Sequence, residues 1–284
     1  MLRAKHALSL LITLKLLLFL CLYTVKANDS DRLAPYVTYL KVSGLQAQIK
    51  LIPKTLFSSL PADFFGDAKT KSKIERAFYT RTDSESWMIV VASEIANAVD
   101  ASDIDELIVF YSTKLGRKLA TAQEGALNTW TLQQTRQGYT RVSILTEDRL
   151  ALLKGLAEKL DLESFNVEAV DAVVQGVFEG YIGQLGKLET TRDHYTLEAF
   201  RKSKKIAQAR TREICLVSLA NSLSPLTNQE LGNLSSFLES PMSHEARSAY
   251  RKALVNVLRN AAQALGKTMR EASANFGSEF RVSD

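Results

Sequence analysis

Cysteine and histidine are scarce in this chain of 284 residues, which holds two cysteines and three histidines. Cys21 lies in an N-terminal apolar run, so Cys215 has no partner for an intramolecular disulfide once that run is removed. Packing must therefore stabilise the fold, and the chain is long enough to bury a substantial core. Cys215 stands beside Ile214 and Leu216, which favours a buried apolar role over that of a nucleophile.

Motifs for catalysis and metal binding are also missing from the sequence. His194 and Glu198 have the spacing that places both on one helix face, with Asp193 adjoining, but a surface pair explains them better than a metal site. No glycine-rich phosphate loop, nucleophile elbow or two-histidine zinc helix occurs. We therefore expect no cofactor, no metal and no catalytic residue, and an enzyme is the second choice behind a binding protein.

The first 27 residues are typical of a secretory signal. Arg3 and Lys5 are followed by a leucine-rich run, and Val25-Lys26-Ala27 offers small residues for cleavage, so the mature chain would begin near Asn28. An uncleaved membrane anchor is the alternative, but Lys15 interrupts the run and leaves it shorter than the roughly 20 apolar residues of a spanning helix. The sequence thus predicts export to the periplasm.

Net charge gives no support for nucleic-acid binding. The 36 basic residues exceed the 31 acidic ones, but four of the basic residues belong to the predicted signal, which holds no acid. The mature chain would be close to neutral, so we expect no nucleic acid among its partners.

Prolines are few, at five, and alternating β-branched runs bounded by turns are almost absent, whereas helical spacing of apolar residues is common. One such ladder runs through Trp87, Val91, Ile95 and Ala98, and another through Ile104, Leu107, Ile108 and Tyr111. The pattern predicts an all-α fold.

A second pattern is an internal repeat. Adding 127 to the numbers of Val99, Asp100, Asp103 and Ile104 gives Leu226, Thr227, Glu230 and Leu231. Each set is spaced as a helix cap with its third position, flanked by an apolar pair that can form a hydrophobic staple. The register continues through Leu107 and Leu234, Phe110 and Phe237, Thr113 and Ser240, Ala122 and Ala249, and Ala126 and Ala253.

Upstream of these caps, an offset of 125 aligns apolar positions such as Val42 with Val167 and Ile52 with Val177. We therefore predict two tandem helical units of about five helices each, spanning residues 28–140 and 141–284. The boundary falls near Gly138 to Thr146, where Thr146 looks like the start of a new helix. Four glycines of the second unit suggest close helix contact or a bent segment: Gly176, Gly180, Gly183 and Gly186.

Between the short capped helix and the next one, each unit has a junction motif in which a helix restarts. Thr113 and Ser240 can cap the new helix, and Pro241 suits its first position, where no amide hydrogen is needed. Gly116 permits close approach of another backbone. Phe110 and Phe237 are expected to hold the corner against the core.

This motif resembles the bacterial exported-protein family called domain of unknown function 2059. The first unit matches through Glu106-Leu107-Ile108, Phe110-Tyr111, Thr113 and Gly116-Arg117-Lys118, but has Lys114 where proline is usual. The second unit keeps Ser240-Pro241 and departs at Leu238 and Ser243. The resemblance covers about 40 residues of the first unit and implies an all-helical envelope protein without an assigned reaction.

Basic residues gather in the connecting segments. The run Arg201-Lys202-Ser203-Lys204-Lys205 is the strongest cluster, and Lys69, Lys71, Lys73 and Arg76 occupy a comparable place in the first unit. A solvated helix face is one explanation of these clusters, and contact with anionic lipid head groups or an acidic partner is the other.

Tyr111 and Trp130 are the candidates for a ligand groove, since two helical units that meet face to face can leave an apolar cleft; core packing is the alternative. We expect an exported, non-catalytic binding or scaffolding protein. Its partner would be another envelope protein, a small apolar ligand or an anionic membrane surface. An envelope enzyme of unknown reaction is the alternative.

Overall fold

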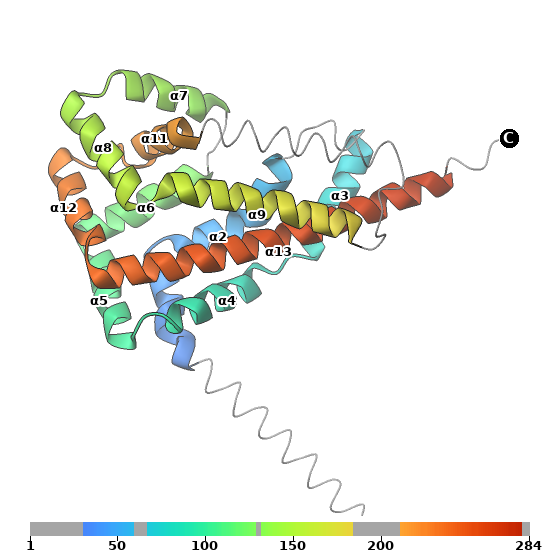
Figure 1. The fold of residues 1–284 in the computed structure, drawn as a ribbon, viewed down its shortest axis with the longest axis horizontal. Coiled ribbons are helices and arrows are strands. Elements are labelled where there is room, and N and C mark those ends of the chain that lie inside the picture. The colour runs from blue at the N-terminus through green and yellow to red at the C-terminus, as the bar shows by residue number, and fades with distance from the viewer. Residues whose placement is uncertain (1–30, 60–66, 129–131, 184–210, 280–284) are drawn as a thin grey trace, which may run out of the picture.

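The computed structural model describes residues 31–59, 67–128, 132–183 and 211–279, and these ranges are helical throughout apart from short turns (Figure 1). They contain no strand, so the predicted all-α fold is confirmed. Within them, no helix is both long and apolar enough to cross a membrane. The predicted signal, Trp130, His194 and the basic run at 201–205 lie outside the described residues.

A helical segment at residues 31–42 comes first, and the numbered helices follow it along the chain. Their bounds are α2 Leu45–Ser59, α3 Ala68–Thr80, α4 Ser84–Ala96, α5 Ala101–Ser112, α6 Lys114–Asn128, α7 Leu132–Ser143, α8 Glu147–Lys159, α9 Leu162–Ile182, α11 Thr211–Ser222, α12 Asn228–Leu238 and α13 Pro241–Glu279.

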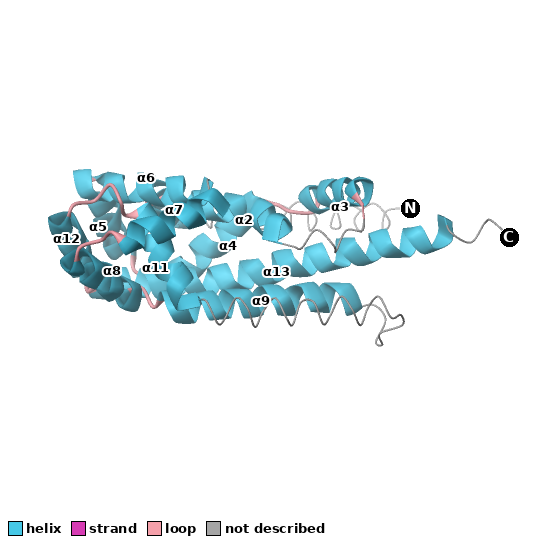
Figure 2. Cartoon of the chain, turned by 90° about the horizontal axis from the view of Figure 1, so that it is seen from above, coloured by secondary structure: helices cyan, strands magenta, loops and turns pink. Residues whose placement is uncertain are grey.

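The longest helices, α9 and α13, lie side by side in both views (Figures 1 and 2). Glycines allow this approach: a Cβ added at Gly176 would lie 2.3 Å from the Arg259 carbonyl oxygen, and one at Gly180 would lie 1.9 Å from that of Gln263. From the α13 side, a Cβ at Gly266 would lie 2.1 Å from the Val177 carbonyl oxygen. The expected close helix contact is thus confirmed at Gly176 and Gly180.

Helix caps follow the sequence pattern in two of three places. Thr227 and Glu230 form the complete capping box of α12, and the Thr146 hydroxyl accepts from the Arg149 amide at the start of α8. Asp100 was expected to cap α5 in the same way, but its side chain makes no cap hydrogen bond. That part of the prediction is wrong, although the Asp100 backbone (φ −69°, ψ 155°) closely resembles that of Thr227 (φ −73°, ψ 166°).

Helix starts agree with the predicted offset of 127, since α5 and α12 begin at Ala101 and Asn228, and α6 and α13 at Lys114 and Pro241. The two units are nevertheless unequal, because α6 ends at Asn128 whereas α13 continues to Glu279. The tandem repeat therefore stays a prediction.

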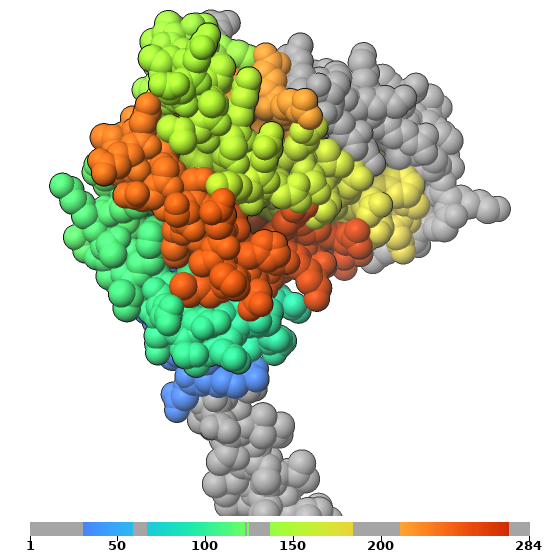
Figure 3. Space-filling view, turned by 60° about the vertical axis from the view of Figure 1, so that its left-hand side comes forward, coloured from blue at the N-terminus to red at the C-terminus, as the bar shows by residue number. Residues whose placement is uncertain are grey.

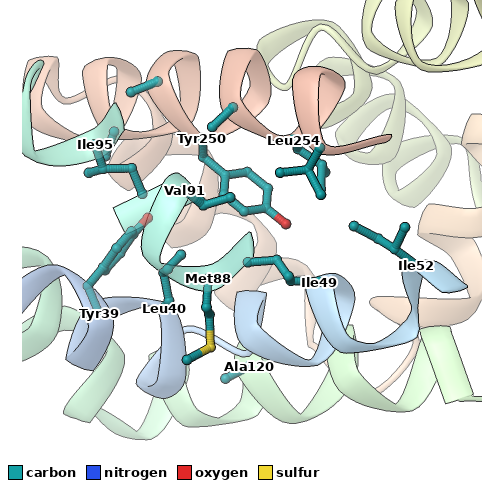
Figure 4. Packing of buried hydrophobic residues seen from close by; sticks show 14 of the residues in the cluster. Tyr39, Leu40, Ile49, Ile52, Met88, Val91, Ile95, Ala120, Tyr250 and Leu254 are labelled. Carbon is teal, nitrogen blue, oxygen red and sulfur yellow. The ribbon is translucent and has the colours of Figure 1, made fainter. Parts of the chain in front are cut away.

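One continuous hydrophobic core joins residues of both predicted units. In Figure 4, Tyr39, Ile49 and Val91 of the first range lie opposite Tyr250 and Leu254 of α13. The ranges 28–140 and 141–284 thus share a core.

Candidate binding site at the α5–α12 corner

The two junction motifs fold into matching corners. Thr113 accepts a hydrogen bond from the Gly116 amide (3.1 Å) and donates to the Phe110 carbonyl (2.7 Å). Ser240 makes the same pair of bonds, with the Ser243 amide (3.3 Å) and the Phe237 carbonyl (2.9 Å). Each hydroxyl thus caps the starting helix by accepting from one of its first amides, and it also bonds to a carbonyl of the ending helix.

Tight turning at the first corner requires glycine, as predicted. A Cβ at position 116 would lie 2.2 Å from the Phe110 carbonyl oxygen and 2.5 Å from the Cα of Tyr111, so the approaching backbone is the end of α5. At the second corner, Pro241 is the first residue of α13, where its missing amide hydrogen costs nothing.

These corners bring Phe110 and Phe237 into direct contact. Their rings are stacked, with centroids 3.5 Å apart and an interplanar angle of 3°. Tyr111 meets both rings edge-on, with its centroid 5.3 Å from that of Phe110 and 6.3 Å from that of Phe237. Both phenylalanines are half-buried and pack against the core, as expected, but they also reach the surface.

An open hollow of about 440 Å³ lies over the stacked rings. Its lining residues are Asp105, Glu106, Val109, Phe110, Phe237 and Met242. Val109 is 66% exposed although it is aliphatic. On this end of the molecule, α12 and the start of α13 (orange) lie against α5 (green) (Figure 3).

The charges at this hollow are of one sign. Asp105 and Glu106 are both exposed, and no basic side chain belongs to the lining. Among the described residues, neither carboxylate takes part in an ion pair. The hollow is therefore an apolar surface with an acidic edge.

Tyr111, a predicted groove residue, lies beneath this surface. It is 8% exposed and packs edge-on against Tyr39, with ring centroids 5.9 Å apart. Burial raises the pKa of its hydroxyl to about 12. Tyr111 thus belongs to the core and does not line the hollow, while Trp130 lies outside the described residues.

Arg247, which the sequence analysis did not single out, supports the corner from within. Its guanidinium donates to the carbonyls of Leu238 (2.7 Å), Lys159 (3.1 Å) and Ser243 (3.1 Å). Leu238 is the last residue of α12 and Lys159 is the last residue of α8. The last carbonyls of a helix have no hydrogen-bond donor within that helix, so Arg247 supplies one at both ends. Burial lowers the pKa of the Arg247 guanidinium, and the neighbouring Tyr111 opposes that effect.

A second hollow, of about 350 Å³, lies between α4 and α13, and most of the residues that line it have polar side chains. Its residues include Glu94, His244, Glu245 and Lys252, and Lys252 pairs with Glu94 at 3.5 Å. The described part of the chain holds no group of three or more His, Cys, Asp or Glu side chains that could bind a metal ion.

Cys215 is buried, as expected from its apolar neighbours in the sequence. The Asn166 amide donates to its sulfur at 3.0 Å, and burial raises the pKa of the thiol. Burial makes a reactive thiolate unfavourable, and the Asn166 hydrogen bond, which lowers the pKa of the thiol, offsets this effect only in part.

Comparison of the chain with family models, curated proteins and solved structures gives no match. Over the residues that the structure describes, the chain is an all-α protein with an apolar surface hollow at a helix corner. The resemblance to domain of unknown function 2059 rests on the junction residues alone.

Proposed function

We propose that the chain is an exported, non-catalytic binding protein and that the α5–α12 hollow is its binding surface. The observation that carries this proposal is the stacked pair Phe110 and Phe237, which forms an apolar floor open to solvent. Burying such a surface against a partner is favourable by roughly 25 cal/mol per Å² of apolar area. Export is part of the proposal because residues 1–27 have the pattern of a secretory signal.

A binding role accounts for the lining better than catalysis does. Asp105 and Glu106 are adjacent on an exposed helix face, and no hydroxyl, thiol, histidine or lysine side chain shares the hollow with them. A hydrolytic or transfer site needs such a group within hydrogen-bond reach of a base. An envelope enzyme is thus the less favoured function for this surface.

A membrane-surface role is a second candidate, favoured by α3. Lys69, Lys73 and Arg76 are exposed on this helix, whose opposite side buries Ile74 and Phe78. A cationic outer face of this kind suits anionic head groups. Vesicles of neutral and anionic lipid would test it by sedimentation: binding to the anionic vesicles that salt abolishes supports the role, and its absence excludes it.

Site-directed photo-crosslinking in the cells that make the protein tests the main proposal. A photoreactive benzoylphenylalanine replaces Val109 in the hollow, and the matched control replaces Ile144, which is 76% exposed and does not line it. We expect a discrete adduct from position 109 and none from 144. The adduct should also disappear when Met242→Lys places a charge in the hollow.

Equal adducts from both positions, or an adduct at 109 that survives Met242→Lys, would contradict the assignment of the hollow as the binding surface.

A further inference from the structure

We infer that the occupant of the α5–α12 hollow is a partner-protein segment with one apolar anchor side chain and a lysine or arginine about two residues from it. This inference rests on the proposed binding function and adds the chemistry of the partner.

Shape favours a side chain of a macromolecule over a small free ligand. Sites for small molecules enclose most of the ligand surface, commonly 70–90% of it. The hollow is instead open, and its apolar lining consists of Phe110, Phe237, Val109 and Met242. A leucine, methionine or phenylalanine side chain can lie on such a floor while its backbone stays outside, which is how interface anchors bind. Met242 adds an adaptable, polarizable contact.

Charge selects the residues beside the anchor. Asp105 and Glu106 lie four and three positions before Val109 on α5, so all three share one helix face. Neither carboxylate has an ion-pair partner among the described residues, and no cation lines the hollow. A cationic segment gains attraction here, and an acidic one is repelled.

Helix geometry sets the spacing between anchor and cation. Four residues of α5 advance about 6 Å along the helix axis, at 1.5 Å per residue. An extended partner segment covers that distance with about two residues, at 3.3 Å each. A lysine two positions from the anchor would therefore stand near Asp105 and Glu106 when the anchor lies beside Val109.

Binding of fluorescein-labelled peptides to the full chain, measured by fluorescence anisotropy at low salt, tests this inference. One set carries a central leucine or phenylalanine with a lysine two positions away on either side. A second set replaces the lysines by glutamates, and a third replaces the anchor by alanine. We expect the lysine set to bind about tenfold more tightly than the glutamate set, because Asp105 and Glu106 attract the lysine and repel the glutamate. The alanine set should bind weakest.

Matched variants locate the effect. Asp105→Asn with Glu106→Gln should remove most of the lysine preference while leaving anchor dependence, and Val109→Lys should abolish binding of the lysine set. Glu147→Gln with Asp148→Asn is the control, because this adjacent exposed pair begins α8 and does not line the hollow. Circular dichroism would confirm that each variant is folded.

The outcomes separate the two claims. If apolar-anchored peptides bind regardless of their charge and Val109→Lys prevents binding, the proposed function stands and the cationic partner is wrong. If the lysine preference survives Asp105→Asn with Glu106→Gln, the inference is also wrong. If no peptide of any set binds, both the inference and the proposed function fail.

Discussion

Replacing Gly180 by alanine should destabilise the protein through the contact between α9 and α13. The new Cβ would lie 1.9 Å from the Gln263 carbonyl oxygen and 2.8 Å from the Gln263 carbonyl carbon, whereas ordinary contact begins at 3.4 Å. Both atoms belong to the backbone, so no side-chain rotation relieves the clash and the two helices must separate locally.

The expected loss of stability in Gly180→Ala is the difference between two opposing effects on the free energy of unfolding. Overpacking of this kind costs about 1–3 kcal/mol, and a backbone obstacle places it toward the upper end. Alanine regains about 1 kcal/mol of helix propensity over glycine. We expect a net loss of about 1–2 kcal/mol in the free energy of unfolding by urea, or a Tm lower by about 2–8 °C.

Two other helical glycines supply the control, because a Cβ at Gly155 or Gly232 would meet no atom within 4 Å. Gly155→Ala in α8 and Gly232→Ala in α12 should stabilise the protein by about 0.5–1 kcal/mol through propensity alone. If Gly180→Ala were as stable as these controls, with an unchanged urea m value, the close packing of α9 on α13 would be refuted.

Four further predictions concern single side chains. Thr227→Ala should cost about 1 kcal/mol in urea unfolding, because it removes the capping box of α12, and Asp100→Ala should cost less than half as much, because Asp100 makes no cap bond; equal losses would contradict this. Arg247→Met should cost about 2–3 kcal/mol by leaving the ends of two helices without a donor, and Arg247→Lys should recover only part of that in the same assay; full recovery would show that charge alone suffices. The hydrogen bond from Lys118 is the main cause that lowers the pKa of Glu230 below its usual 4.5. Because the pKa of Glu230 is lower in the folded than in the unfolded state, its carboxylate stabilises the protein above about pH 4.5, and this stabilisation is lost as the pH falls through the folded-state pKa. The difference in unfolding free energy between the native protein and Glu230→Gln should therefore shrink on acidification, which urea midpoints measured from near-neutral pH to about pH 3 would show. A constant difference would contradict the assignment. Cys215 should react with a water-soluble disulfide reagent far more slowly in the native protein than in urea, because its thiol is buried with a raised pKa; equal rates would contradict its burial.

Local features of this fold could be predicted because they depend on a few neighbouring residues. The spacing of Thr227 and Glu230 determines a capping box within one turn, and the junction hydroxyls Thr113 and Ser240 bond only to residues three positions away. Asp100 shows the limit of such patterns. Its backbone takes the expected extended conformation, but backbone conformation alone does not decide where a side chain points.

The hollow could not be predicted, because it depends on contacts between distant residues. Helix α5 contains four consecutive apolar residues, Leu107, Ile108, Val109 and Phe110. Their side chains must point in different directions around the helix, and their hydropathy does not tell which of them faces solvent. Stacking of Phe110 on Phe237 joins positions far apart in the chain.

Arg247 was missed for a related reason. A basic residue on an amphipathic helix is normally taken as solvated, and its actual partners are carbonyls at the ends of two other helices. Nothing in the sequence around Arg247 indicates where those helices end relative to it.

Methyl NMR of the protein labelled at the methionine methyl carbons would test the central claim most directly. Met242 lines the hollow, whereas Met88 and Met269 are buried in the core, so the three methyl signals report on different places. Replacing Met242 by leucine assigns its signal. During titration with a lysine-flanked apolar peptide, the account predicts progressive movement of the Met242 signal while those of Met88 and Met269 stay in place. A peptide that binds and leaves the Met242 signal unmoved would contradict the placement of the binding surface at the α5–α12 hollow.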